Sequence, residues 1–579
     1  MSSDQKHNEW SILQPDEKTV IQLVRKAGLS DPVARLLVNR GITETIEAKN
    51  FLDPALKNLL SPDGLPDMDL ASKRVVDAIK NKEKIVVYGD YDADGTTASA
   101  LLYKFFEEMG AIVEVYQPDR RKEGYGLNTD ALGRLINDGA SLVVCVDLGI
   151  ADSEAVEWAS NKNLDIVVVD HHQVPEIIPK AVAVVDPLRS EEAEPYYPLS
   201  GVGLAFYLAA SIRGMVRDDE HFKDMEEPDL KKYLDLVALG TIADMVPLTG
   251  VNRILVTHGL KELGAERRPG VAALKREAKL KRKRITAGQV AFMLGPRLNA
   301  AGRMADASVA VDLLTTEDDA EARRLAMELE DLNHRRQDVE RGIVEEADRM
   351  IREEKLNEEP AIVIGSKNWH PGVLGIVASR IVDRYSIPTV VISFDGEDGK
   401  GSVRSVPGVN VWKALEQCSE HIVAFGGHEM AGGLMIEKSR FDDFHRKFRE
   451  AVEEMKASAK HKVLTIDMEF DLEDLDPFFV RKLSQLAPHG MGNPEPLFVA
   501  RSVSCVAVRR VGSNHLKFRV NQGNSAIDAI AFGQSDSADM MKGPVDLAFV
   551  PSISSYDNWE KVEIKVRSIR PAGESPEKS

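Results

Sequence analysis

The chain has 579 residues, of which 43% are hydrophobic and 29% are charged, and it carries a formal net charge of −19. This length predicts three or four domains, and no run approaches the roughly 18 apolar residues that a membrane span needs, which argues against a membrane protein. The negative charge argues against a surface coated with positive side chains for non-specific nucleic-acid binding, although it leaves room for a local basic groove.

The first 50 residues are expected to form a helical N-terminal extension. Their opening segment, MSSDQKHNEW, has no basic region followed by an apolar one, so we expect no signal peptide. Cys145, Cys418 and Cys505 are too far apart to form a CxxC pair, which argues against a zinc site and against a disulfide framework. We therefore expect a reducing, cytoplasmic location.

Residues 51–315 are expected to form one α/β domain. Between residues 84 and 187 helical patterns alternate with short β-branched runs, which are KIVVYGD, AIVEVYQ, SLVVCVD, DIVVVD and AVAVVD. Runs that are apolar on both faces indicate a parallel sheet covered by helices. Ligands of such sheets bind at the carboxyl ends of the strands, and several runs end there in aspartate: Asp90, Asp147, Asp170 and, as a further candidate, Asp186.

The rest of this domain, residues 200–315, is predicted to be mostly helical. It contains a basic segment at residues 266–284, with the sequence ERRPGVAALKREAKLKRKR. A solvated helix face and a local basic groove explain this segment equally well.

Four further segments complete the predicted α/β architecture. Residues 316–357 form a long amphipathic connecting helix, because apolar residues recur there at steps of three and four. Residues 358–460 are a second α/β domain. Residues 461–570 contain short alternating runs such as LKFRV and KVEIKV, which are typical of a small antiparallel barrel of the OB type. Residues 571–579 are an expected disordered tail.

The segment KIVVYGDYDADGTTA raises a chemical question, because Asp90, Asp92 and Asp94 occupy every second position of one tight loop. Carboxylates at such spacing repel one another, so a cation is expected among them. An EF-hand is excluded because its twelfth position, which requires glutamate, is Leu101 and because the preceding segment is a predicted strand. The glycine and lysine pattern of a phosphate-binding P-loop is also absent from the sequence.

The better interpretation combines acidic and imidazole groups from several predicted strand or turn ends. These residues are Asp92, Asp94, Asp147, Asp170, His171, His172 and Asp244. Oxygen ligands with one or two imidazoles suit Mn²⁺ or Mg²⁺ better than zinc, and the carboxylates suffice for two ions of the kind that serve phosphoryl chemistry. Each aspartate alone could be a helix cap or a turn residue, but four such clusters together favour a metal centre.

At this point the motifs resemble a known family. GDYDADGTTA, VDLGI, DHH and GTIADMVPL resemble the DHH phosphoesterase superfamily, and PRLNAAGRM, WHPGVLGIVASRI, KGSVRS and GGHEMAGG resemble its RecJ family of single-strand-specific 5′→3′ exonucleases. The resemblance covers about residues 50–570. Leu148 departs from the small or polar residue that is common in relatives, which puts no ligand in doubt.

The resemblance implies roles for individual residues. Asp92 and Asp147, with Asp90 close by, resemble ligands of one ion, and Asp94, Asp147, His171 and Asp244 resemble ligands of a second. His172 resembles a phosphate-facing residue, and Tyr88 stands where some relatives carry a histidine, so its contact with an ion is left open. The 5′-terminal phosphate would be bound by Arg120, Arg303, Ser402 and Arg404, and His428 would line the active-site face of the second α/β domain.

The expected function is therefore a monomeric 5′→3′ exonuclease that releases 5′-mononucleotides from single-stranded DNA by two-metal hydrolysis, in DNA repair and recombination. We expect the barrel to contribute affinity for the strand and no metal ligand. The resemblance also implies a single-strand binding protein and a RecQ-type helicase as partners. The alternatives are a phosphodiesterase or pyrophosphatase acting on short oligoribonucleotides, cyclic dinucleotides or other small substrates, and a non-catalytic member that binds a replication complex.

Overall fold

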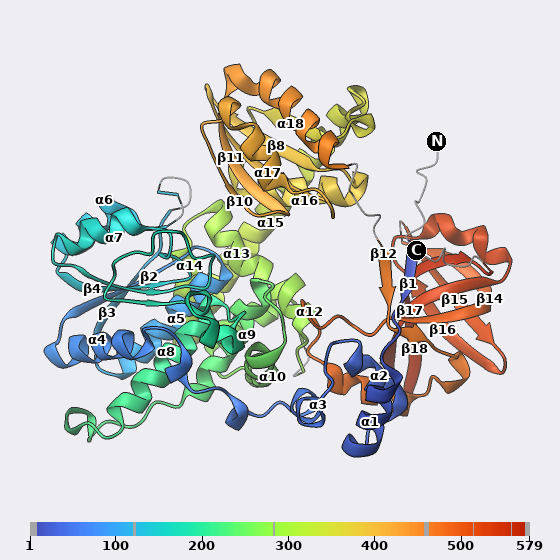
Figure 1. Cartoon of the computed structure of the whole chain (residues 1–579), viewed down its shortest axis with the longest axis horizontal. Coiled ribbons are helices and arrows are strands. Elements are labelled where there is room, and N and C mark those ends of the chain that lie inside the picture. Colours follow the sequence, from blue (N-terminus) through green and yellow to red (C-terminus); the bar gives the residue numbers. More distant parts are fainter. Residues whose placement is uncertain are drawn as a thin grey trace. The chain divides into compact units, whose positions relative to one another are not determined.

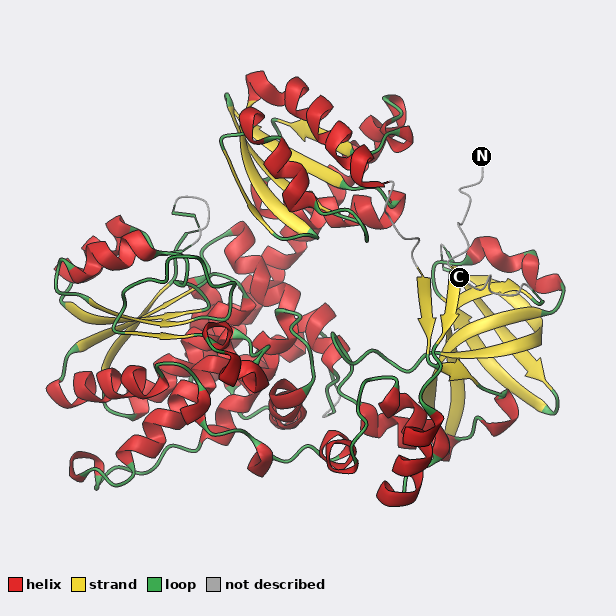
Figure 2. Cartoon of the chain, in the orientation of Figure 1, coloured by secondary structure: helices red, strands yellow, loops and turns green. Residues whose placement is uncertain are grey.

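The computed structural model of the chain describes residues 9–119, 123–124, 126–281, 284–456, 463–512, 514–556 and 559–573. By their internal contacts these residues divide into two compact units. Their helices and strands are drawn in Figures 1 and 2. Among the described residues, the first unit takes those within 9–296, 310–323 and 463–573, and the second takes those within 297–309 and 324–456.

The sheet that positions the candidate site is five-stranded and entirely parallel, in the order β3-β2-β4-β5-β6. Its strands are β2 (Lys84–Gly89), β3 (Ile112–Tyr116), β4 (Ala140–Val146), β5 (Asp165–Val169) and β6 (Ala183–Val185). The inner strands are buried on both faces beneath α4 (Met68–Asn81), α5 (Ala93–Glu108), α6 (Thr129–Asn137), α7 (Ser153–Ser160) and α8 (Gly201–Val216). This confirms the parallel sheet that the β-branched runs predicted, one strand for each run.

The remainder of this region is helical, as predicted. Its helices are α9 (Leu234–Ala243), α10 (Gly250–Ala265), α11 (Pro269–Glu277), α12 (Ala287–Gln289), a π-helical turn (Val290–Leu294) and α14 (Ser308–Thr315). Helix α13 (Gly295–Met304) follows the π-helical turn, and most of its residues belong to the second unit. Part of the basic segment 266–284 is structural, because Lys275 is buried against Glu266 and Arg268 pairs with Asp235. Residues 282 and 283 lie outside the described residues, and exposed charges remain at Arg276 and Lys279.

The second unit is built on a mixed sheet in the order β10-β11-β9-β8-β7. Its strands are β7 (Ile362–Ser366), β8 (Thr389–Asp395), β9 (Asp398–Arg404), β10 (Ala424–Gly427) and β11 (Ala431–Glu437). The helices are α15 (Asp319–Glu353), which lies within the predicted connecting helix, α16 (Leu374–Tyr385), α17 (Val411–Gln417) and α18 (Phe441–Lys456). One core contains apolar residues of α15 and α16, and a second contains those of α17 and α18.

The C-terminal region is a closed barrel. Strands β14 (Phe498–Val511), β15 (His515–Gln522), β16 (Ser525–Ala531), β18 (Trp559–Pro571) and β17 (Val545–Tyr556) follow one another, and β14 also pairs with β17. The short β13 (Met468–Glu469) and helix α19 (Pro477–Leu483) precede it. Pro571 ends the last strand, and residues 574–579 of the expected tail lie outside the described residues.

The N-terminal helices share one hydrophobic cluster with the barrel. Helices α1 (Glu17–Ala27), α2 (Asp31–Val38) and α3 (Thr45–Leu52) contribute residues such as Leu23 and Leu37, which join Phe498 and Phe549 in one buried cluster. Strand β1 (Glu9–Ile12) pairs in parallel with β12 (Val463–Ile466). Within the described part of the chain, no helix combines the length and apolar character of a membrane span.

Candidate metal centre

The candidate site lies at the carboxyl ends of strands β2, β4 and β5, where the sequence predicted it. Asp90 follows β2, and the carboxylate of Asp92 caps helix α5 by accepting the backbone amides of Asp94 (2.8 Å) and Gly95 (3.1 Å). The side chain of Gln117 donates to the backbone carbonyl of Asp90 (2.8 Å). The helix cap made by Asp92 and the hydrogen bond from Gln117 thus fix the conformation of the acidic loop.

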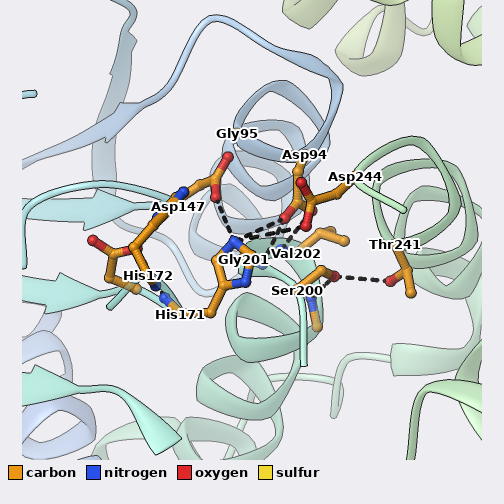
Figure 3. A network of polar contacts seen from close by, with 12 residues as sticks. Asp94, Gly95, Asp147, His171, His172, Ser200, Gly201, Val202, Thr241 and Asp244 are labelled. Carbon is orange, nitrogen blue, oxygen red and sulfur yellow. Dashed lines mark hydrogen bonds and ion pairs between the residues drawn. The ribbon is translucent and has the colours of Figure 1, made fainter. Parts of the chain in front are cut away.

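Asp94 is held by a helix that is distant in sequence. Its carboxylate accepts the amide of Gly201 at 2.6 Å and that of Val202 at 3.0 Å, both in the first turn of α8 (Figure 3). Ser200 caps this helix and lies 2.9 Å from the hydroxyl of Thr241 on α9. The orphan amides at a helix N-terminus stabilise a buried carboxylate, so α8 fixes Asp94 in one orientation.

Asp147 and His171 occupy the centre of the cluster. The Nε2 atom of His171 lies 3.0 Å from Asp147 Oδ1 and 3.8 Å from Oδ2 of both Asp94 and Asp244 (Figure 3). Asp147 follows β4 with a positive φ of 64°, a left-handed conformation that aspartate tolerates better than most residues. Such conformations are common at functional sites, where the surrounding structure maintains them.

Asp170 orients the two histidines that follow it. Its buried carboxylate accepts the amide of Ile150 (3.0 Å), the amide of His171 (2.8 Å) and, at 2.7 Å, the Nδ1 proton of His172. Burial opposes a charged His172, but the hydrogen bond to Asp170 together with the negative charges of Asp170, Asp244 and Asp90 outweighs it, so the pKa of His172 rises to about 9. Asp170 thus binds the main chain of His171 and the side chain of His172, and supporting carboxylates of this kind commonly orient histidine rings in metal sites.

Burial and mutual repulsion disfavour the ionised form of the central carboxylates when no counter-charge is present. Burial, followed by repulsion from neighbouring aspartates, raises the pKa of Asp94 to about 7 and that of Asp244 to about 8, and raises the pKa of Asp147 well above its usual range. Burial lowers the pKa of His171 to about 4, which keeps its ring neutral and able to coordinate. A cation among these oxygens would reverse the repulsion, so the donor set fits a divalent metal.

Three groups of side chains bring their donor atoms within 4.8 Å of one another. They are Asp90, Asp92 and Asp147; Asp94, His171 and Asp244; and Asp147, His171 and His172. Asp147 belongs to two groups, which suits a residue shared between two ions. Tyr88 packs in the hydrophobic core, where its hydroxyl donates to the carbonyl of Gly126 at 3.4 Å.

Two of the residues predicted to bind a terminal phosphate, Ser402 and Arg404, lie in the second unit, whereas the candidate metal ligands lie in the first. Ser402 and Arg404 lie on β9, where the Arg404 Nη1 atom donates to Ser402 Oγ (3.1 Å) and to the Val403 carbonyl (2.8 Å). A Cβ atom on Gly375, in the first turn of α16, would lie 2.8 Å from Arg404 Nη2 and 3.2 Å from Ser402 Oγ. Both side chains therefore adjoin a helix N-terminus, a favourable environment for an anion.

The structure describes two of the three remaining substrate-binding candidates, Arg303 and His428. The Arg303 Nη1 atom donates to the carbonyl of Gly372 (3.1 Å), just before α16, so Arg303 adjoins the same end of this helix. His428 is exposed in the turn between β10 and β11, and its amide donates to Ala431 (2.7 Å). Arg120 lies outside the described residues.

Sequence reasoning missed the first turn of α8 as part of the site. The signal was present in LSGVGLAF, where Ser200 precedes two glycines and an apolar run, a pattern typical of a capped helix start. This pattern does not indicate that the carboxylate of Asp94, 107 residues earlier, accepts the amide of Gly201.

Family models match three parts of the chain. The description "DHH family, N-terminal domain" matches residues 84–241, "DHHA1 domain" matches residues 358–454 and "RecJ OB domain" matches residues 466–568. The second α/β region and the closed barrel described above therefore correspond to known domain types.

Relatives resemble the chain over nearly its whole length. The single-stranded-DNA-specific exonuclease RecJ of Dickeya dadantii is 36% identical over 93% of this chain and 95% of its own, and that of Escherichia coli is 34% identical over 94% and 96%. RecJ of Thermus thermophilus, crystallised in complex with Mn²⁺, matches 98% of this chain and 80% of its own with a TM-score of 0.84 and 28% identity. A Mg²⁺ complex of the same protein gives a TM-score of 0.76 at 28% identity, over 97% of this chain and 78% of its own.

Proposed function

The chain belongs to the RecJ family of single-stranded-DNA-specific exonucleases, and from this premise we propose that it degrades single-stranded DNA from the 5′ end, releasing 5′-mononucleotides with the help of two divalent ions. The observation that carries the proposal is the cluster around Asp147 and His171, where two groups of possible ligands share Asp147. Mn²⁺ and Mg²⁺ are the proposed ions, because oxygen-rich sites with imidazole suit them.

Each ion would have its own set of protein ligands. Asp90, Asp92 and Asp147 would hold one ion, and Asp94, Asp147, His171 and Asp244 would hold the other. Divalent ions in such centres lower the pKa of water and neutralise the charge that develops on a phosphate during hydrolysis.

Neighbouring protein groups orient the proposed ligands and set their protonation states. The α8 amides hold the carboxylate of Asp94, and burial keeps His171 neutral. Asp170 accepts the Nδ1 proton of His172, so the other ring nitrogen, Nε2, would face a phosphate oxygen of the substrate. His172 also belongs to a possible ligand group with Asp147 and His171, so its ring would stand beside the reacting phosphate.

The proposed direction of hydrolysis depends on the anion environment in the second unit. Arg303, Ser402 and Arg404 adjoin the N-terminus of α16, and the planar guanidinium fork matches two phosphate oxygens. A terminal 5′-phosphate carries more negative charge than an internal phosphodiester, so such a site would prefer the end of a strand.

The barrel would hold the single strand by stacking and by charge. Arg509, Arg510 and Lys517 are exposed on β14 and β15, as expected for contacts with phosphates. Phe518 on β15 is buried in the core, so it is not available to stack on bases. The exposed aromatic neighbour is Phe532, which is 54% exposed and packs edge-on against His515 at 5.2 Å between ring centroids.

Two alternatives are less well supported. Phosphodiesterases of small substrates need no strand-holding barrel, whereas this chain has one that matches the RecJ OB domain. A non-catalytic binding protein would have no need to retain seven ionisable residues in one cluster. Participation in DNA repair and recombination, beside a single-strand binding protein and a RecQ-type helicase, belongs to the proposal through family membership alone.

Hydrolysis should require Mn²⁺ or Mg²⁺ and should not be supported by Ca²⁺, which relaxes the coordination geometry that smaller ions impose. The test uses single-stranded DNA labelled at either end, with each ion and with a chelator. Early release of labelled mononucleotide from the 5′-labelled strand alone is expected. Release from the 3′ end, comparable rates in Ca²⁺, or preference for RNA or cyclic dinucleotides would each refute part of the proposal.

Replacing Gly201 with alanine should slow hydrolysis by about a hundredfold, since small displacements of catalytic groups have effects of this size. The added Cβ would lie 2.7 Å from the Cβ of Asp147, an atom that moves only with its main chain. Gly214→Ala is the matched control, because it lies in the same helix with no atom within 4 Å of the added Cβ. Equal turnover of the two variants would show that Asp147 tolerates displacement.

A further inference from the structure

The loop that follows Asp244 is covered by a loop from the region that leads into the barrel. Asp244 ends helix α9, and residues 245–249 connect it to α10. The amide of Leu248 donates to the carbonyl of Met491 at 2.8 Å. This is a main-chain contact between the segment carrying a candidate metal ligand and a segment more than 240 residues later.

The two loops approach so closely that residues larger than glycine would clash at Gly490 and Gly492. A Cβ on Gly492 would lie 2.9 Å from the Cβ of Pro247 and 3.3 Å from Thr249 Cγ2, and a Cβ on Gly490 would lie 2.8 Å from Leu248 Cδ1. The proline ring is rigid, so Pro247 has little freedom to move aside. Gly492 also has a φ of 70°, which disfavours other residues.

The opposite side of the Asp244 loop is fixed as well. Asn252, buried in the first turn of α10, donates through Nδ2 to the carbonyls of Pro247 (3.0 Å) and Pro198 (2.6 Å). Met245 has a positive φ of 63°, a conformation that is unfavourable for methionine and persists only where neighbours maintain it. Residues 245–249, the Asp244 loop, are thus held between Asn252 on one side and Gly490–Asn493, the glycine loop, on the other.

Buried polar contacts anchor the glycine loop. The fully buried Arg253 donates to four carbonyls, those of Phe51, Gln485, Leu486 and Ala487, at 2.8–3.1 Å. Asn493, also fully buried, donates to the carbonyls of Leu486 (2.7 Å) and Pro488 (2.8 Å) and accepts Nε of Arg40 (2.9 Å). Groups that satisfy so many buried carbonyls make a docked loop costly to displace.

We propose that the glycine loop, Gly490–Asn493, is a positioning element for Asp244, so that docking of the barrel region sets the affinity of the metal centre. The inference rests on the proposed metal function of Asp244 and adds a second role to a region otherwise proposed only to hold DNA. Supporting residues of metal ligands typically change metal affinity by about 10- to 100-fold when they are altered. The glycine loop would act in this way through main-chain and apolar contacts.

The test measures Mn²⁺ binding to the full-length metal-free chain by calorimetry, together with its thermal unfolding. Gly492→Ala should weaken binding of one of two ions by about tenfold or more, and added Mn²⁺ should restore its turnover of single-stranded DNA. Gly28→Ala is the matched control, since Gly28 has the same φ of 70° but no atom within 4 Å of an added Cβ. The control should bind Mn²⁺ as the parent does.

The outcomes separate the inference from the proposed function. Should the parent bind no Mn²⁺, the metal centre itself would be refuted. Should Asp244→Asn weaken Mn²⁺ binding while folded Gly492→Ala binds as the parent does, the positioning role would be refuted. If Gly492→Ala fails to fold, Gly490→Ala replaces it: its Cβ would lie 2.8 Å from Leu248 Cδ1 and 3.2 Å from Leu248 Cγ, so it presses on the same loop less strongly. A smaller weakening of Mn²⁺ binding is then expected, and parent-like binding by that folded variant would refute the role.

Discussion

Replacing Asp147 with alanine is expected to abolish hydrolysis of single-stranded DNA while the chain remains folded. Asp147 shares one possible ligand group with Asp90 and Asp92, and its Oδ1 atom lies 3.0 Å from Nε2 of His171, a proposed ligand of the second ion, so its loss would weaken both proposed ion sites at once. Burial, followed by repulsion from neighbouring carboxylates, raises the pKa of its carboxyl group well above the usual range. Removing it relieves repulsion in the metal-free chain, so thermal stability should not collapse.

Asp147→Asn is the better-matched variant for this experiment. Alanine at a φ of 64° adds backbone strain of about 1 kcal/mol, whereas asparagine tolerates this conformation and keeps the size of the side chain. Both variants should lose turnover, and the asparagine variant should unfold at or above the parent's temperature. Turnover within about tenfold of the parent in either variant would refute a shared ligand at this position.

Replacing Arg404 with alanine is expected to reduce the preference for 5′-phosphorylated strands over 5′-hydroxyl strands by about 10- to 100-fold. This range corresponds to one charged hydrogen bond of roughly 1.5–3 kcal/mol. The metal centre is built by other residues, so slow hydrolysis of both strands should persist. The quantity to measure is the ratio of the two rates, in the variant and in the parent.

Two further variants distinguish recognition from a structural role of Arg404. Arg404→Lys keeps the charge but loses the planar fork, so it should recover only part of the preference. Arg446→Ala removes an exposed arginine of the same unit, on α18, that pairs with Asp443. This control should leave the ratio unchanged. An unchanged ratio in Arg404→Ala would mean that the strand end is recognised elsewhere.

The sheet and its acidic edge were predictable because both depend on local pattern. Strands buried on both faces leave a continuous β-branched signature, and a parallel sheet places the residues after β2, β4 and β5 at one edge. Asp90, Asp147 and Asp170 therefore followed from composition and spacing alone. The groupings that link Asp147 with Asp92 and His171 came from the family resemblance, and their metal-binding roles stay predictions.

The missing parts depend on contacts between segments that are distant in sequence. Periodicity shows that α1 has an apolar face but gives no information about what covers it, and Leu23 is in fact buried in a hydrophobic cluster that continues into the barrel. In the same way, nothing local to Gly492 shows that Pro247 lies against it. Alternation correctly marks Phe518 as facing one side of β15, but only the closed barrel shows that this side is the interior.

The shared core of the N-terminal helices and the barrel affects how the chain must fold during synthesis. Residues 17–52 leave the ribosome first, yet Phe498 and Phe549 are made only after more than 400 further residues. At the usual rate of about 5–20 residues per second, the apolar faces of α1–α3 stay without their partners for roughly 20–80 s. The apolar faces of α1–α3 are therefore expected to reach their final packing only after the barrel strands have been made.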